Sequence, residues 1–422
     1  MNGVIAVWCN NFTPLHARPT RIYLSGQAVS MIGTFLQSTA LGLVVFDLSG
    51  GIATSLGLLS ICQALPVLLL SPFSGSVADR FARRYVLLAC HGIQMSVALT
   101  LALLSHTGAV QLWHIYGLAV LLGCTQSVYF PAQQAFLFDL VGLHEIRKLV
   151  SINSMVLNVA RTGGPALAAF LIAQFGVAMA FLQNGLSFLA VIASLLALRS
   201  VQAAKQDHRE PSSLAAVLRL VANDVRLRNL YFCAAILHMF GLAMLQLIPA
   251  LTHGDARQTG LILASAGAGS LCYAFLLSPF VTRLSRVGAI LPLSLVWMGG
   301  WFLVAAQSQA LELRMFSIFM AGLATSLAMV GCTGTMQFVA PAALRGRLMG
   351  LFNVVGLGLQ PFAVMSISTV ADRIGASSAI SLAGVTAMLL ALLMLTNKRW
   401  ARWELVDTPT TLGIPGNALG KS

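Results

Sequence analysis

One arginine lies inside a long apolar segment of the chain, where a fixed charge could bind an ionic solute. Arg161 follows the start of this segment near Ser151, so a helix would carry it about 15 Å from that end at 1.5 Å per residue. A charged side chain at the centre of a membrane helix costs about 2.5–3.5 kcal/mol on insertion scales. We therefore interpret Arg161 as a cation that faces a central cavity and binds an anionic group. The alternative is a structural arginine satisfied by helix carbonyls or by Asn158.

Uncharged polar residues recur on other apolar segments at helical spacing. One stripe consists of Gln27, Ser30, Thr34, Gln37 and Ser38. Inside a membrane, such a stripe faces either a cavity or a partner helix, and we favour the cavity. His238 could titrate near neutral pH, although a hydrogen-bonded core histidine is the alternative. The predicted substrate cavity contains Gln37, Gln126, Asn158, Arg161, His238, Gln246, Asn353 and Gln360.

A cavity with one cation and several amides predicts the chemistry of its solute. It suits a polar organic molecule with acidic or metal-chelating oxygens, such as an iron-free siderophore. It does not suit a dication, which requires carboxylates. Cationic drugs fit less well, and neutral amphipathic drugs such as macrolides remain open.

The sequence carries no motif for enzymatic chemistry. It contains no H-E-x-x-H, G-x-S-x-G or Walker loop, and its seven cysteines are scattered without a C-x-x-C pair. We therefore predict a non-enzyme that needs no cofactor and holds no metal site. A non-transporting membrane scaffold or receptor is the alternative from another class.

Composition places these residues in membrane-spanning helices. The 422 residues are 58% hydrophobic and only 9% charged, with a mean hydropathy of +0.85. A soluble protein carries about 25% charged residues. Apolar runs of about 20 residues predict helices rather than the shorter strands of a barrel. We count twelve such runs, which predicts an all-α membrane protein.

The net charge of +13 is distributed unevenly rather than gathered for nucleic acid, which we exclude as a partner. Twenty-one of the 25 Lys and Arg residues fall in the tails and alternate loops that twelve spans place on one side. By the positive-inside rule this side is cytoplasmic, and so are both termini. The predicted organisation is a tail at 1–20, a six-helix bundle at 21–199, a linker at 200–229, a second six-helix bundle at 230–400, and a tail at 401–422.

A short charged loop separates the second and third spans. It carries Gly75, Asp79, Arg80, Arg83 and Arg84. Four charges in six residues mark a turn at the membrane surface. We expect Asp79, with Arg83 or Arg84 and with Asp139 at the end of the fourth span, to form a charge cluster that gates conformational change.

This pattern, Gly75-x-x-x-Asp79-Arg80-x-x-Arg83-Arg84, resembles the signature loop of the major facilitator superfamily. Arg345-Gly346-Arg347 and the Gly-Gly-Pro at 163–165 are similar to the subgroup of enterobactin-type siderophore exporters and related drug efflux proteins. The resemblance implies two pseudo-symmetric six-helix bundles, alternating access and efflux across the bacterial inner membrane.

The antiporter pattern of the fifth span stands here as Ala160-x-x-x-Gly164-Pro165-x-x-Ala168-Ala169, with alanine at three of its glycine positions. Alanine side chains are small enough that another helix can still approach closely. Gly164 and Pro165 are therefore predicted helix-packing residues. We expect a monomer in the lipid bilayer, with H⁺ as the coupling ion, although no carboxylate lies at mid-membrane to carry the proton.

Overall fold

The computed structural model describes residues 13–198, 214–277, 286–341 and 344–397, together with Trp400 and Trp403. The N-terminal half contains η1 (Thr13–His16), α2 (Arg18–Leu48), α3 (Thr54–Arg80), α4 (Arg83–His106), α5 (Leu112–Phe175) and α6 (Val177–Ala197). The C-terminal half contains α7 (Leu214–Asn223), α8 (Val225–Ile236), η2 (Leu237–Leu242), α9 (Ala243–Gln246), α10 (Ile248–Leu251), α11 (Ala256–Cys272), η3 (Tyr273–Leu277), α13 (Val287–Gln307), α14 (Leu311–Val339), α15 (Arg345–Ile374) and α16 (Ala376–Thr396).

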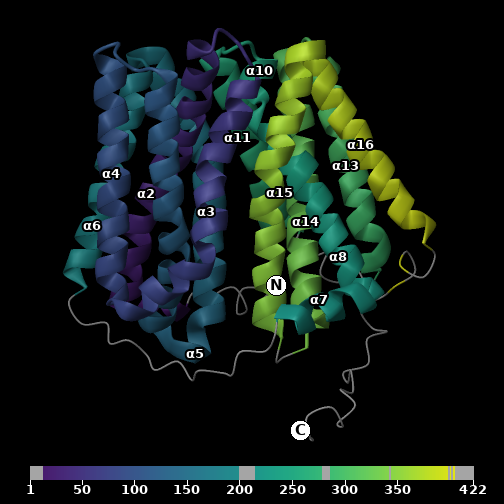
Figure 1. Ribbon diagram of the computed structural model, residues 1–422, viewed down its shortest axis with the longest axis horizontal. Coiled ribbons are helices and arrows are strands. Elements are labelled where there is room, and N and C mark those ends of the chain that lie inside the picture. Colours follow the sequence, from purple (N-terminus) through teal and green to yellow (C-terminus); the bar gives the residue numbers. More distant parts are fainter. Residues whose placement is uncertain are drawn as a thin grey trace, which may run out of the picture.

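The predicted all-helical membrane fold is confirmed. Eleven segments of the described chain are long and apolar enough to cross a membrane. The 27-residue α3 adds another, and its described apolar part is Thr54–Leu70. Large apolar side chains such as Leu69, Leu103 and Leu393 are more than half exposed, as expected for helices that face lipid. Figure 1 shows the helices as two upright bundles side by side.

One long helix, α5, contains two of the predicted spans. The sequence predicts a charged loop from Asp139 to Lys148, but the chain stays helical on both sides of Gly142. Gly142 has φ 69° and ψ −172°, a conformation that glycine adopts without steric cost. The chain therefore reverses at one residue, and the spans run Leu112–Gly142 and Lys148–Phe175.

The apolar run Leu230–Leu251, which opens the predicted second bundle, is expected to form one span, but it is broken rather than continuous. Its middle is the π-helical η2, and Leu247 separates α9 from α10. Pro249 lies in the first turn of α10, where its missing N–H leaves no helical bond unmade. π-Helical turns are rare and are often found at functional sites. This break places Leu245 and Gln246 at the centre of the molecule.

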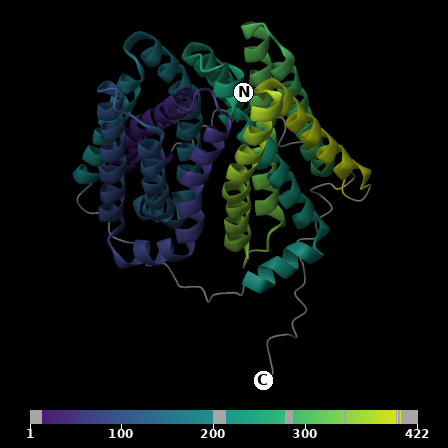
Figure 2. The ribbon, with the colours of Figure 1, turned by 45° about the horizontal axis from the view of Figure 1, so that its top comes forward.

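The two halves contact each other through α3 with α15 and through α5 with α11. Small residues make the second contact possible, because a Cβ on Gly267 would lie 2.5 Å from the Cα of Thr162. We call the end of the molecule that carries Arg83 the arginine-rich end. Figures 1 and 2 show α7 at this end as well.

The end opposite the arginine-rich end is closed by hydrogen bonds between the halves. The Asp372 carboxylate of α15 accepts hydrogen bonds from Ala53 N (2.6 Å), Thr54 N (2.9 Å) and the Thr54 hydroxyl. Asp372 therefore caps the first turn of α3 from the other half of the protein, where a negative charge is favourable.

Candidate functional site

A cavity of about 300 Å³ lies between the two halves. Both halves contribute to its wall, through α2, α3 and α5 on one side and α9, α11, α13, α14 and α15 on the other. Its polar and aromatic lining consists of Phe35, Ser38, Thr39, Gln63, Arg161, Gln246, Ser270, Phe302, Thr325 and Gln360. The rest of the lining is aliphatic, apart from glycine and proline residues.

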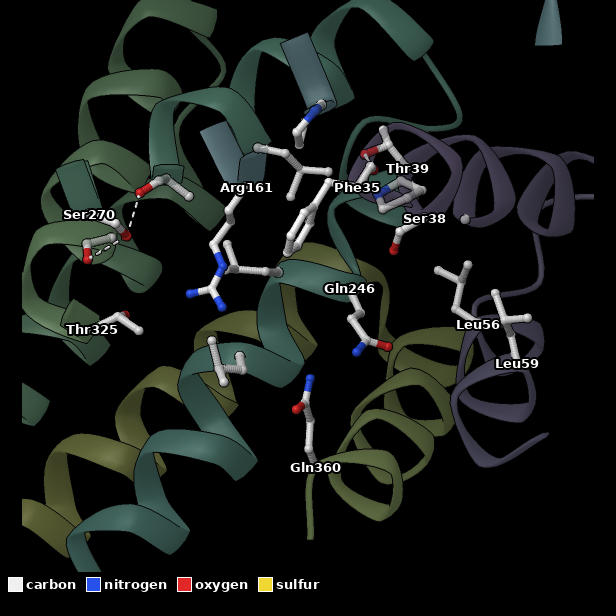
Figure 3. Close-up of a pocket in the computed structure, with 18 of the residues that line it drawn as sticks. Phe35, Ser38, Thr39, Leu56, Leu59, Arg161, Gln246, Ser270, Thr325 and Gln360 are labelled. Carbon is white, nitrogen blue, oxygen red and sulfur yellow. Dashed lines mark hydrogen bonds between the residues drawn. The ribbon is translucent and has the colours of Figure 1, made fainter. Parts of the chain in front are cut away.

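Arg161 is the single charged side chain among the described residues that line this cavity. It comes from the second span of α5, and its guanidinium carbon lies 5.9 Å from the centre of the Phe35 ring. In the described part of the chain it makes neither an ion pair nor a hydrogen bond. Figure 3 shows the guanidinium with Phe35, Gln246 and Gln360 on one side and Ser270 and Thr325 on the other. Its five N–H donors are therefore available to an anionic oxygen.

The neutral polar groups of the cavity differ in how many hydrogen bonds they already make within the protein. Ser270 and Thr325 donate to carbonyls of their own helices, at 3.1 Å from Ala266 O and 2.7 Å from Ala321 O. Gln246 accepts a hydrogen bond from Ser60 of the opposite half, which leaves its NH₂ group to donate. The arrangement can thus bind an acidic group beside further oxygen acceptors.

A second cavity of about 180 Å³ adjoins the first and lies within the N-terminal half. We call it the amide pocket, because its polar lining consists of Thr34, Gln37, Ser38, Gln63, Gln94, Gln126 and Asn184. Ser38 and Gln63 line both cavities. Asn184 donates to Gln37 at 2.6 Å, whereas the Oε1 atom of Gln126 is buried without a partner among the described residues.

The structure divides the predicted cavity residues into three groups. Arg161, Gln246 and Gln360 line the central cavity, and Gln37 and Gln126 line the amide pocket. His238 is not among the lining residues of either cavity; its Nδ1 donates to Ala234 O at 2.8 Å and its ring abuts Gly356. The side chains of Asn158 and Asn353 lie outside the described part of the structure.

The predicted charge cluster is described only in part: Gly75, Asp79 and Arg80 lie in the last part of α3, where the structure describes the backbone and not the side chains. Arg83 forms an ion pair with Asp139, joining the start of α4 to α5, and both side chains are largely buried. Arg84 turns instead to the end of α6, where it donates to Leu195 O (2.7 Å) and Leu196 O (3.0 Å). Arginines in such positions satisfy the last carbonyls of a helix.

The predicted packing residue Gly164 lies against α2. A Cβ on Gly164 would stand 2.9 Å from Leu36 N and 3.0 Å from Ile32 O, so only glycine allows this approach. Pro165, the next residue, lines the central cavity. Gly164 thus brings Arg161, one turn earlier, beside Phe35.

Sequence reasoning missed several lining residues. Phe35 and Phe302 resemble any other apolar residue in a membrane span, so the sequence holds no signal for them. Gln63, Gln94 and Asn184 could have been found as isolated amides in apolar runs. Among the described residues there is no group of three or more His, Cys, Asp or Glu that could hold a metal ion.

A helical membrane protein with two bundles around a shared polar cavity has the architecture of a secondary transporter of the major facilitator type. Comparison with known proteins agrees: the model of the transmembrane secretion effector family matches residues 9–420. The chain belongs to this family of transporters and is not an enzyme.

Two curated bacterial relatives are similar along nearly the whole chain. The MFS-type transporter YfiS of Bacillus subtilis is 26% identical over 397 residues, covering 90% of this chain and 93% of that protein. The staphyloferrin A transporter of Staphylococcus aureus is 21% identical over 395 residues, covering 92% and 98%. The fold matches a bacterial homologue of the human lysosomal transporter Spinster with a TM-score of 0.69 at 14% identity, covering 91% of this chain and 98% of that one.

Proposed function

We propose that this protein exports a small organic chelator of the siderophore class across the bacterial inner membrane by proton-coupled alternating access. The observation that carries the proposal is Arg161, which has no ion-pair or hydrogen-bond partner among the described residues, in a cavity whose other described polar groups are neutral. One cation among amide and hydroxyl groups suits a solute with an acidic group and further hydrogen-bonding oxygens. The similarity to a staphyloferrin A transporter supports this substrate class.

The test is transport by the purified full-length protein in proteoliposomes. We expect the siderophore staphyloferrin A to be transported and Arg161→Ala to abolish its transport. Arg161→Lys should keep partial activity, since lysine retains the charge and loses the planar fork. Arg314→Ala is the control, because Arg314 donates to Ser308 O at 2.7 Å and is not a cavity residue. Normal transport by Arg161→Ala would contradict the proposal.

The apolar part of the lining supports a second candidate, efflux of neutral amphipathic drugs. The cavity has an apolar wall formed by Phe302, Leu56 and Leu59. This wall could contact part of a macrolide-sized ring. If cationic or neutral drugs are transported, staphyloferrin A is not, and Arg161→Ala has no effect, drug efflux is the better description.

A further inference from the structure

The N-terminal half contains a second group of polar side chains, which the transport site does not use. These residues lie on the facing surfaces of α2, α4 and α5, between the amide pocket and the arginine-rich end. Within the described chain, three of their buried polar atoms have no hydrogen-bond partner: Thr20 Oγ1, Gln27 Oε1 and His91 Nε2. Tyr23 and Gln133 lie beside them and interact with each other. Buried polar atoms in proteins are almost always paired, commonly with internal water.

His91 of α4 is the titratable imidazole in this group, and it is only 2% exposed. Its Nδ1 lies 3.1 Å from Oε1 of Gln94. An amide oxygen can only accept, so Nδ1 carries the hydrogen and Nε2 is left with a free lone pair. Nε2 is therefore a buried base with no partner among the described residues.

The groups that face His91 are all uncharged. On α5, the Tyr129 ring packs edge-on against it with centroids 5.2 Å apart, and on α6 Phe188 lies at 5.8 Å. On α4 itself, Cys90 precedes it and donates to Thr125 O at 3.9 Å. On α2, Gln27 donates a hydrogen bond to the hydroxyl of Tyr129, which packs against His91. No described ion pair or hydrogen bond links the ring to a charged side chain.

Polar contacts extend from His91 in two directions. Toward the transport site, its partner Gln94 lines the amide pocket. Toward the arginine-rich end, Tyr129 accepts a hydrogen bond from Gln27 Nε2 at 2.8 Å. One helical turn further on lie Tyr23, before Gln27 on α2, and Gln133, after Tyr129 on α5. Thr20 is at the start of α2, close to Arg18.

We propose that His91 is the proton-binding site of this carrier, and that water held by the unpaired groups connects it to the arginine-rich end. The inference rests on the proposed proton-coupled export and identifies the group that performs it. A neutral imidazole with a free lone pair can take up a proton, which a coupling site requires when no carboxylate lies at mid-membrane.

Gln94 supplies the coupling between proton and solute. Protonation of Nε2 makes His91 a cation, which strengthens the hydrogen bond from Nδ1 to Gln94 Oε1. A solute that draws the Gln94 amide away from His91 into the amide pocket breaks this hydrogen bond. The proton and such a solute therefore oppose each other's binding, as exchange of one for the other demands.

The first test observes the proton directly and needs no substrate. Purified full-length protein with ¹⁵N-labelled histidine is titrated from about pH 8 downward, to the lowest pH at which the protein stays folded. The signal that His91→Gln removes should move from the neutral to the protonated position. His106→Gln, the same change at an exposed site on α4, should leave that signal in place. A His91 signal that keeps its neutral Nδ1–H position throughout would overturn the proposal.

The second test separates coupling from transport in proteoliposomes, with staphyloferrin A as the probe. His91→Gln should lose accumulation driven by a pH gradient and keep exchange of labelled for unlabelled probe. His106→Gln should behave as wild type. If His91→Gln does not fold, Tyr129→Phe takes its place and should slow the gradient-driven step alone. Gradient-driven accumulation by both variants at the wild-type rate would refute the site.

The two tests also separate this proposal from the proposed function. If wild-type protein transports no staphyloferrin A, the substrate assignment fails, and the histidine titration still decides whether His91 binds the proton.

Discussion

At the scale of single residues, Gly164 determines where Arg161 lies. It brings α5 against Leu36 and Ile32 of α2, and Phe35 of the same turn faces the Arg161 guanidinium. We predict that Gly164→Val separates these helices. The cost should be about 1–3 kcal/mol, as for other overpacked sites.

Neighbouring Gly163 offers a matched control, because a Cβ there meets nothing within 4 Å. Gly163→Val should leave the melting temperature and transport close to wild type, whereas Gly164→Val should lower both. The measurement is thermal unfolding in detergent followed by reconstitution. Equal melting temperatures for the two variants would show that the α2–α5 contact is not tight.

A second residue-scale prediction concerns the Arg83–Asp139 ion pair. Its side chains are 13% and 4% exposed, so removing one partner leaves the other charge buried. Asp139→Asn should therefore destabilise the protein by about 3–5 kcal/mol. The Lys148–Glu145 pair at 3.1 Å is more exposed, at 25% and 33%, and Glu145→Gln should cost only about 0.2–1 kcal/mol.

Chemical unfolding monitored by circular dichroism ranks these two variants. We expect Asp139→Asn to unfold at clearly lower denaturant concentration than Glu145→Gln. The reverse order would mean that the buried ion pair contributes no more than a surface pair.

At the scale of helices, the Asp372 cap is a contact that opening must break. It accepts hydrogen bonds from two backbone N–H groups and one hydroxyl at the start of α3. Hydrogen bonds to a charged group contribute about 1.5–3 kcal/mol each. We predict that Asp372→Ala favours opening at the end opposite the arginine-rich end.

This opening can be measured by labelling a cavity cysteine, Ser38→Cys, in a background without the seven native cysteines. Added Asp372→Ala should speed labelling by a membrane-impermeant maleimide from that side. Glu312→Ala, an exposed acid in the first turn of α14, should not. Unchanged labelling in Asp372→Ala would rule out the cap as a closing contact.

The helices show what sequence alone can and cannot predict. Hydropathy predicted the spans because a helix that crosses lipid must be long and apolar, and a long apolar run is visible in the sequence itself. It did not predict the helical reversal at Gly142, because charged residues at 139–148 resemble a loop. Nor did it predict the π-helical η2.

The candidate site was predictable to the extent that its residues are polar in an apolar setting. Arg161, Gln246 and Gln360 have this signal and line the central cavity. His238 has the same signal and does not line it, because a local bond to Ala234 O satisfies its ring. Polarity in a span identifies a buried polar group, and only the fold determines which face of the helix it occupies.

At the scale of the whole molecule, the two halves meet around the central cavity. The contacts of Asp372 with α3 and of Gly57 with Ser368 join them near the end opposite the arginine-rich end. Alternating access requires these contacts to separate while each half keeps its own packing. A covalent link across them should therefore stop transport, and a link within one half should not.

We predict that a protein carrying Thr54→Cys and Asp372→Cys loses transport on oxidation and regains it on reduction. These two side chains touch across the halves, so a bond between them holds α3 and α15 together. The control pair, Gln307→Cys with Ser381→Cys, replaces a hydrogen bond of 2.9 Å between α13 and α16 of the same half. Because each half moves as a body, oxidation of the control should leave transport unchanged. Transport that survives a complete Thr54→Cys and Asp372→Cys cross-link would show that substrate passes without separation of α3 from α15, and the rocking mechanism would be wrong for this protein.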